Sequence, residues 1–133
     1  MLVVDSSVWV DFLNGHWSLE TEYLANCLSD DVPIVLPGLV RAEILAGLRT
    51  DAEAERVASL LEAFDAAPEP TTGDYAAAAG ILRSCRRTGA GIGSVVDCVI
   101  AQTCLSHGYA LLTKERDFRR IAAESALRLV EFA

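Results

Sequence analysis

Five acidic residues of this sequence lie beside or inside apolar segments, where ionised side chains are unusual. They are Asp5, Glu43, Asp97, Glu115 and Asp117. A carboxylate next to an apolar core is costly unless a positive group neutralises it. No cluster of Lys or Arg accompanies these acids, so a divalent metal ion is the simplest neutralising partner. Because the candidate ligands are all hard oxygens, they suit Mg²⁺ or Mn²⁺, one or two ions per site, rather than zinc.

Two of these acids also have a purely structural interpretation at the start of a helix. Asp5 follows the apolar run Leu2–Val4 and precedes a helical pattern, where Asp is a favoured N-terminal cap. Ser94 and Asp97 have the spacing of a capping box, and a helix N-terminus stabilises an ionised carboxylate. The capping and metal-binding roles of Asp97 are compatible, so this residue alone decides little.

The other three acids favour a site more clearly. On a helical wheel, Glu43 falls between Leu39 and Val40, within the apolar stripe of its predicted helix. A buried Glu without a partner would take up a proton. Taken alone, Glu115 and Asp117 are typical of a solvated turn. They belong to a segment in which a predicted strand is followed by a hydroxyl residue, the two acids with a basic residue between them, and an aromatic residue. This pattern favours a functional role instead.

Short apolar runs alternate with helical patterns along the whole chain. The apolar runs predict strands at 2–4, 32–36, 109–113 and 127–130. The helical patterns predict helices at 6–13, 19–28, 38–48, 51–64, 71–87, 94–107 and 117–123. Pro68 and Pro70 predict a short edge strand or a loop, and the glycines at 89–93 predict a flexible loop.

Strands separated by helices predict a single α/β domain over residues 1–133, an α/β/α sandwich with a mainly parallel central sheet. In such sheets, ligand sites form beyond the carboxyl ends of the strands. Asp5, Glu115 and Asp117 directly follow two predicted strands. They would meet at one edge of the sheet if the first strand and the strand at 109–113 are neighbours.

The composition is that of a folded domain with an acidic surface. The chain has 133 residues, 52% hydrophobic and 23% charged, which excludes an intrinsically disordered protein. The formal net charge is −8, opposite in sign to that of a general nucleic-acid coat protein. The candidate acids contribute −5 of this charge, so bound metal would leave a mildly acidic surface. This balance argues against a non-specific nucleic-acid binder but not against a metal-dependent nuclease.

The sequence contains no segment typical of a membrane or secretory protein. No apolar run reaches the roughly 18 residues that a membrane span requires. No basic segment precedes the first predicted strand, so no secretory signal is visible. We therefore expect a cytoplasmic protein that does not bind membranes.

Two further groups of residues are candidates for binding. An apolar face on the first helix predicts core packing or a groove for a partner, and its residues are Trp9, Phe12 and Leu13. Arginines at a helix end complement the helix dipole and also form the best local basic patch for RNA phosphates. The candidate RNA contacts at this helix end are Arg83, Arg86 and Arg87. A fourth candidate, Arg116, lies between Glu115 and Asp117.

Taken together, four segments of the chain resemble the motifs of the PIN-domain ribonucleases, specifically the VapC-type toxins of type II toxin–antitoxin systems. The segments are Val4–Val10, Arg41–Ile44, Val96–Ala101 and Leu112–Phe118. Any one of them is weak evidence, but all four in this order and at this length are fairly specific. The sequence departs from the family at two positions: Ser6 replaces the commoner Thr, and Glu115 the usual Asp. Either Glu115 or Asp117 therefore completes the site.

The resemblance implies a metal-dependent endoribonuclease that cleaves structured RNA, a tRNA or rRNA loop, through a metal-activated water. Asp5 and Asp97 would anchor the metal, and Glu43 would orient the water. Glu115 or Asp117 would hold a second ion or a water. Supporting hydroxyl groups would come from Ser6, Ser7 and Thr113.

The resemblance also implies protein partners: a cognate antitoxin, a homodimer and a toxin–antitoxin hetero-oligomer. The apolar face around Trp9 and Phe12 is the expected antitoxin groove. On this expectation, Trp9→Ala weakens antitoxin binding more than it slows RNA cleavage.

Three other classes of protein compete with this interpretation. A haloacid-dehalogenase-type phosphatase needs a second Asp two residues after Asp5, but position 7 is Ser. A phosphoacceptor receiver domain needs an acidic pair after the first strand and an Asp after a middle strand, and the segment Leu36–Gly38 offers neither. A catalytically silent PIN-like protein-binding module would have lost its ligands, whereas all four motif positions here are acidic.

Overall fold

The computed structural model describes residues 1–89 and 91–132, in which four strands alternate with seven helices. The strands are β1 (Leu2–Val4), β2 (Ile34–Leu36), β3 (Asp65–Ala66) and β4 (Ala110–Leu112). The helices are α1 (Ser6–Leu13), α2 (Leu19–Ser29), α3 (Gly38–Ala46), α4 (Asp51–Leu61), α5 (Thr72–Arg87), α6 (Val95–His107) and α7 (Arg116–Ala123). Ala90, which belongs to the loop predicted at 89–93, lies outside the described residues.

The strands form one parallel sheet in the order β3-β2-β1-β4. The first strand is therefore central: Leu2 is in register with Ile34 of β2 on one side and with Ala110 of β4 on the other. Parallel neighbours need a crossover connection, and the intervening helices supply it. The predicted α/β architecture with a parallel central sheet is confirmed, and so is the pairing of the first strand with the strand near 109–113.

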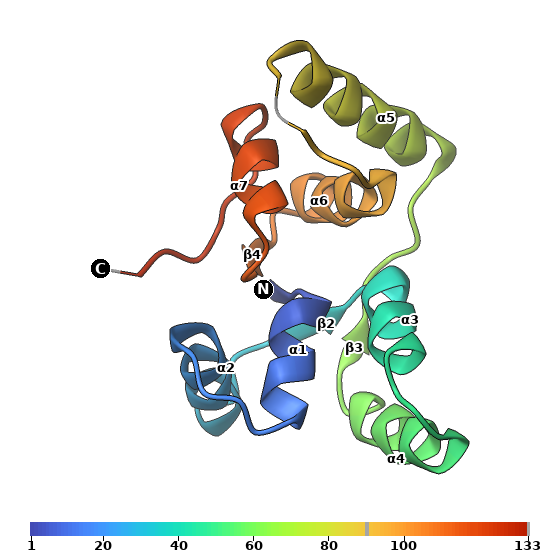
Figure 1. Ribbon diagram of the computed structural model, residues 1–133, viewed down its shortest axis with the longest axis vertical. Helices are drawn as coiled ribbons and strands as arrows, with labels where there is room; N and C mark the ends of the chain where they lie inside the picture. The colour runs from blue at the N-terminus through green and yellow to red at the C-terminus, as the bar shows by residue number, and fades with distance from the viewer. Residues whose placement is uncertain (90, 133) are drawn as a thin grey trace.

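Helices cover both faces of the sheet. In Figure 1, α5, α6 and α7 lie above the strands, whereas α1 to α4 lie around and below them. Every residue of β1 and β2 is buried, as expected for parallel strands covered on both faces. Fully buried side chains such as Leu24 of α2, Ile44 of α3 and Phe118 of α7 come from both groups of helices. The strands and these side chains form one core.

Two predicted segments differ from the observed elements. The helix predicted to reach residue 64 ends at Leu61, where the Phe64 N–H donates to the Leu61 carbonyl at 3.1 Å in a tight turn. A short edge strand that was not predicted, β3, follows at once, and residues 68–70 form a loop, one of the two alternatives predicted for them. The strand predicted at 127–130 is reduced to a single bridge, because only Leu111 of β4 pairs with Leu129. The other elements begin and end within two residues of the prediction.

The carboxyl ends of β1 and β4 lie side by side at one edge of the sheet, since Val4 is in register with Leu112. The residues that follow these strands, Asp5 and the segment 113–117, therefore leave the sheet at the same point. The Asp5 N–H donates to the Leu112 carbonyl at 2.9 Å and extends the pairing by one residue. This edge carries the candidate site.

Candidate active site

The carboxylate of Asp5 is buried, with 2% exposure, and is held by two hydroxyl groups. Its Oδ2 atom accepts a hydrogen bond from Ser7 Oγ at 2.7 Å and another from Thr113 Oγ1 at 3.0 Å. Asp5 occupies the N-cap position of α1 but makes no side-chain cap bond. Asp5 therefore stands at the predicted cap position, but its carboxylate bonds to the two hydroxyl groups and not to the N–H groups of α1.

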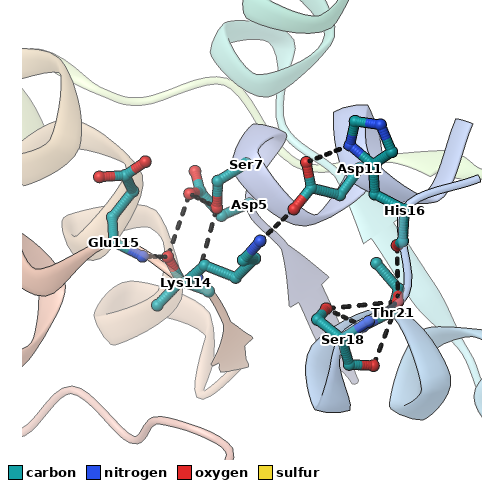
Figure 2. Close-up of polar contacts among 9 residues, drawn as sticks. Asp5, Ser7, Asp11, His16, Ser18, Thr21, Lys114 and Glu115 are labelled. Carbon is teal, nitrogen blue, oxygen red and sulfur yellow. Dashed lines mark hydrogen bonds and ion pairs between the residues drawn. The ribbon is translucent and has the colours of Figure 1, made fainter. Parts of the chain in front are cut away.

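The loop after β4 is tied to the start of α1 (Figure 2). Thr113 Oγ1 accepts a hydrogen bond from the Glu115 N–H at 3.0 Å while it donates to Asp5. The Lys114 N–H donates to Ser7 Oγ at 3.3 Å. The hydroxyl groups of Ser7 and Thr113 thus connect the two chain segments that carry Asp5 and Glu115.

Asp97 lies in the first turn of α6 and is half-buried. The predicted capping box is not formed, because the Ser94 hydroxyl accepts from the Val96 N–H at 3.1 Å rather than from the Asp97 N–H. Burial, the largest cause, and the neighbouring carboxylates together raise the pKa of Asp97 to about 6. In decreasing order of effect, those neighbours are Asp5, Glu43, Asp117 and Glu115. All five predicted acids therefore form one electrostatic group.

Glu43 is exposed, which corrects the expectation that it is buried within an apolar stripe. The adjacent Val40 and Ile44 enter the core, and Glu43 lies at the rim of that face. Its Oε1 atom accepts a hydrogen bond from Ser6 Oγ at 3.3 Å. Partial desolvation raises the pKa of Glu43, as does the negative charge of Asp5, while the Ser6 bond lowers it. Glu43 thus faces the other acids from an open position.

The two candidates for the last site acid differ in their surroundings. Asp117 is half-buried in the first turn of α7, and its Oδ1 lies 3.6 Å from Arg120 Nη1. Glu115 is exposed at the N-cap of α7, where it makes no cap bond. Among the described residues, the Glu115 carboxylate has no hydrogen bond or ion pair. Arg120 partly neutralises Asp117, so Glu115 carries the less compensated charge.

The carboxylate oxygens of these acids are donors that suit a magnesium or manganese ion, but they do not form a complete coordination site. Within residues 1–89 and 91–132, no three Asp, Glu, His or Cys side chains lie within range of one shared ion. Mg²⁺ typically keeps several waters and is bound through one or two carboxylates, which this arrangement allows. The neighbouring carboxylates add to the effect of burial in raising the pKa of Asp97, and a cation would relieve their repulsion.

One contact at this site was not predicted from the sequence. Lys114 Nζ donates to Asp11 Oδ2 of α1, and His16 Nδ1 lies 3.7 Å from Asp11 Oδ1 (Figure 2). The Lys114 bond is the main reason that the pKa of Asp11 is lowered. Lys114 is the single lysine of the chain and adjoins Thr113, but neither fact identifies its partner. The tertiary contact with residue 11 was not visible in the sequence.

The predicted RNA contacts are accessible at the surface. All four arginines lie in exposed positions of α5 and α7, two helices that pack against each other. These residues are Arg83, Arg86, Arg87 and Arg116. Arg87 Nη2 donates to Ser84 Oγ at 2.9 Å. The basic groups predicted from the α5 helix end are thus available to a ligand.

Trp9 lies in the core, with 3% exposure, which corrects the expectation that it lines a partner groove. Its ring packs edge-on against Phe64, with centroids 5.2 Å apart, and against Phe12 at 6.4 Å. Phe12 and Leu13 are half-buried and remain partly accessible. Trp9 is a packing residue, because Phe64, brought in by the early end of α4, covers it.

Comparison with known proteins adds the family context. The sequence matches the PIN domain family over residues 2–124. It is 29% identical over 133 residues to VapC ribonuclease Mb1587 of Mycobacterium bovis, and the match covers 99% of each chain. Ribonuclease VapC11 of Mycobacterium tuberculosis has the same identity and coverage.

Solved structures with the same fold come from several bacteria. VapBC2 from Rickettsia felis, bound to a DNA fragment from its promoter, has a TM-score of 0.76 and 17% identity, covering 99% of this chain and 98% of that one. VapBC-1 from nontypeable Haemophilus influenzae has a TM-score of 0.74 and 17% identity, covering 98% and 96%. At these identities the likeness establishes the fold alone.

Proposed function

The chain belongs to the PIN domain family, and from this membership and the acidic site we propose that it is a metal-dependent endoribonuclease acting as the toxin of a toxin–antitoxin pair. The observation that carries the proposal is the convergence of the acids: Asp5 and the segment with Glu115 leave the sheet at one edge and are joined through Thr113, and Asp97 lies in the same group of charges. Grouping carboxylates in this way is unfavourable for an empty protein and favourable for one that binds a cation.

Each acid has a role in this proposal that follows from its surroundings. Asp5 and Asp97 would hold the ion, with Glu115 or Asp117 binding through a water or a second ion. Bound Mg²⁺ or Mn²⁺ would activate a water and stabilise negative charge on the phosphate. Glu43, open to solvent and hydrogen-bonded to Ser6, would orient the attacking water. Attack by water leaves a 5′-phosphate and a 3′-hydroxyl group.

The Ser7 and Thr113 hydroxyl groups act as positioning groups for the Asp5 carboxylate. Both donate to the same oxygen, Oδ2, so they fix the carboxylate plane and leave Oδ1 for a ligand. A carboxylate that is held before the ligand arrives loses less conformational entropy on binding. This arrangement supports a role for Asp5 as the principal anchor.

The proposed substrate is structured RNA, a tRNA or rRNA loop, contacted through its phosphates by the exposed arginines of α5 and α7. On a chain with a net charge of −8, a local basic patch is needed to bind a polyanion. The loss of the arginine contacts would weaken RNA binding without altering the chemistry at the acids. Neutralising Arg86 and Arg87 together should reduce the salt dependence of RNA binding by roughly one to two units of the log–log slope.

The proposed partner is a small antitoxin, and we also propose homodimers and toxin–antitoxin hetero-oligomers. Solved relatives carry VapBC and FitAcB names, which supports a partner of this kind. Because Trp9 is buried, the docking surface must use other residues. A cleft of about 530 Å³ between α1 and the α3–α4 region has a mixed lining that includes Leu13, Ile44 and Arg49, and it is the proposed alternative.

We propose a cytoplasmic location, where such an enzyme would meet its RNA. No described helix is both long enough and apolar enough to span a bilayer.

The proposal is tested by incubating purified protein with total cellular RNA in Mn²⁺ and in chelator, and mapping the new 5′ ends. The expected result is a small set of discrete, metal-dependent cuts that carry 5′-phosphates. Asp97→Asn should abolish them, while Asp51→Asn, an exposed acid on α4, should leave them unchanged. Products with 2′,3′-cyclic phosphates would reject the mechanism. Folded protein without any cutting would favour the silent protein-binding module.

A further inference from the structure

The loop that carries Glu115 is attached to the α1 region at three successive points. Thr113 Oγ1 donates to Asp5 Oδ2, and the Lys114 N–H donates to Ser7 Oγ. The third attachment is the ion pair between the Lys114 ammonium and Asp11. The first attachment is made to Asp5 itself and the second to Ser7, two residues further on. The third lies further along α1 and does not involve any of the five acids.

The helix geometry explains why Lys114 reaches both Ser7 and Asp11. These two residues are four positions apart on α1, so their side chains lie one above the other on the same face. Lys114 runs along this face: its backbone N–H contacts Ser7 and its ammonium contacts Asp11 (Figure 2). The side chain therefore fixes the direction of the loop relative to α1, in addition to its distance.

The ion pair is only partly open to water, since the exposed fractions of the two side chains are 36% for Lys114 and 22% for Asp11. Such a pair contributes little to global stability. The ion pair has a greater effect on the position of the loop than on stability, because the Glu115 carboxylate has no hydrogen bond or ion pair of its own in the described part of the chain. The position of Glu115 therefore depends on its backbone, which is held by its own N–H bond to Thr113 Oγ1 and by the attachments of the neighbouring Lys114.

The choice of residue is consistent with this role. Of the 11 basic residues of the chain, Lys114 alone is a lysine. Its ammonium is a compact charge on a long stem that can run along a helix face, whereas an arginine presents a planar fork suited to two acceptors. The side chain points along α1 toward Asp11 and away from the Glu115 carboxylate (Figure 2).

We propose that Asp11 and Lys114 are positioning residues: their ion pair holds the loop at 113–115 so that the Glu115 carboxylate stays in the acidic group that contains Asp5 and Asp97. This inference rests on the proposed nuclease function for its catalytic consequence. Its structural part, the placement of Glu115, is independent of that function. A displacement of a reacting group by about 1 Å can cost 100-fold in rate, so a weak ion pair can have a large effect on cleavage.

Amide hydrogen exchange measured by NMR, without RNA or metal, tests the structural part. Asp11→Asn and Lys114→Met should each speed exchange at the Glu115 amide about tenfold or more, while core amides of β1 stay unchanged. Lys114→Arg keeps the charge but not the compact ammonium, so its exchange rate should fall between those of the wild type and Lys114→Met. The matched control is Arg128→Met, which removes an exposed basic side chain that anchors the other end of β4 through the Gly108 carbonyl. It should not affect Glu115.

Single-turnover RNA cleavage in Mn²⁺ tests the catalytic part with the same variants. Asp11→Asn and Lys114→Met should slow cleavage about 10- to 100-fold at saturating protein, with RNA affinity changed less than threefold. The double variant Asp11→Lys with Lys114→Asp should recover part of the loss, because it restores the opposite charges. Recovery of this kind is not expected from a general loss of stability.

Three results would overturn the inference. Unchanged exchange at Glu115 in both single variants would show that the ion pair does not hold the loop. Faster exchange with unchanged cleavage would show that the held position is not needed. A loss of cleavage in Lys114→Met alone, with Asp11→Asn fully active, would show that the lysine acts on RNA directly. Wild-type protein that cleaves no RNA would reject the proposed function, and the exchange result would then decide the inference.

Discussion

Asp97 has a proton affinity that depends on the charges around it. Its pKa of about 6 lies far above the ordinary value of 3.8, because the ionised form is half-buried and faces four other carboxylates. Near neutral pH the metal-free protein must therefore keep an ionised group that its surroundings disfavour. The same surroundings would favour a bound cation, so the residue links metal binding, stability and pH.

A first prediction concerns the stability of the metal-free protein between about pH 4 and pH 7. Asp97 has a raised folded-state pKa, so its contribution to stability is complete below the unfolded value near 3.8 and is lost as the pH rises through about 6. We expect the Tm in chelator to fall by a few degrees across this range. Asp97→Asn should reduce the fall, as measured by thermal unfolding followed by circular dichroism.

The other shifted acids act either in the same direction or at lower pH. Burial and the charge of Asp5 also raise the pKa of Glu43, so Glu43 adds to the fall. Asp74 is held near a pKa of 2 by hydrogen bonds from the Thr71 N–H and the Ser106 hydroxyl, so it acts only at lower pH. The pKa of Asp11 is lowered and also acts below the chosen range. Asp74→Asn is therefore the control and should leave the slope above pH 4 unchanged. An equal slope in the wild type and Asp97→Asn would contradict the prediction.

At the scale of elements, the first helix is held to the core by an aromatic cluster. Trp9 on α1 packs against Phe64, which follows α4. We expect Trp9→Ala to lower the free energy of unfolding by about 3–5 kcal/mol, the usual cost of emptying a buried aromatic site. Trp9→Phe should cost less than half of this, because it keeps the ring and removes the indole Nε1, which has no partner among the described residues. Urea unfolding measures both.

The Trp9 result also separates packing from partner binding. A stable Trp9→Ala protein that failed only in antitoxin binding would contradict the core position described above. Leu13→Glu, at a half-buried position in the proposed cleft, provides the comparison: it should weaken antitoxin binding with a smaller loss of stability.

A third prediction concerns the turn between α6 and β4. Gly108 ends α6 in the left-handed conformation, with φ of 70°, and leads directly into the strand that precedes the acidic loop. A Cβ atom at this position would meet nothing within 4 Å, so Gly108→Ala should cost only the backbone penalty, about 1–2 kcal/mol. Gly93→Ala, where φ is not positive and the space is equally open, should cost less. Urea unfolding of both variants checks the difference.

The local pattern of apolar residues predicted most helices and strands correctly. It failed where contacts with distant parts of the chain determine the conformation. The apolar and helical periods gave the central strands and the helices that flank them. The pattern at 51–64 is helical to its end, yet Phe64 leaves the helix and packs against Trp9. The apolar run at 127–130 reads as a strand, but it meets β4 only at Leu111. Both outcomes depend on partners distant in the sequence.

At the scale of the whole molecule, metal binding should couple to folding. An ion that binds only the native state stabilises it by about 2.7 kcal/mol at 100 times its Kd. We therefore predict that saturating Mn²⁺ raises the Tm of the wild type by several degrees and that of Asp97→Asn by much less. Differential scanning calorimetry in Mn²⁺ and in chelator measures the shift. An unchanged Tm in the wild type would make tight metal binding untenable.

The candidate site was predictable to the extent that strand ends and motif positions define it. Asp5 and Glu115 could be placed together because both follow neighbouring strands of a parallel sheet. The exposure of Glu43 could not be read from the helical pattern, since the apolar stripe gives no information on where its rim lies. The ion pair between Asp11 and Lys114 could not be found either, because it depends on how a loop lies across a helix.

The central place of β1 in the sheet has a consequence for how the protein is made. The strand is synthesised first, but one of its neighbours is β4, more than 100 residues later, and the loop after β4 supplies the hydroxyl that holds Asp5. Contacts between such distant segments form late in folding. A ribosome that has translated only the first hundred codons therefore carries a chain with three of the acids and no assembled site. All five acids can come together only after translation has passed residue 117.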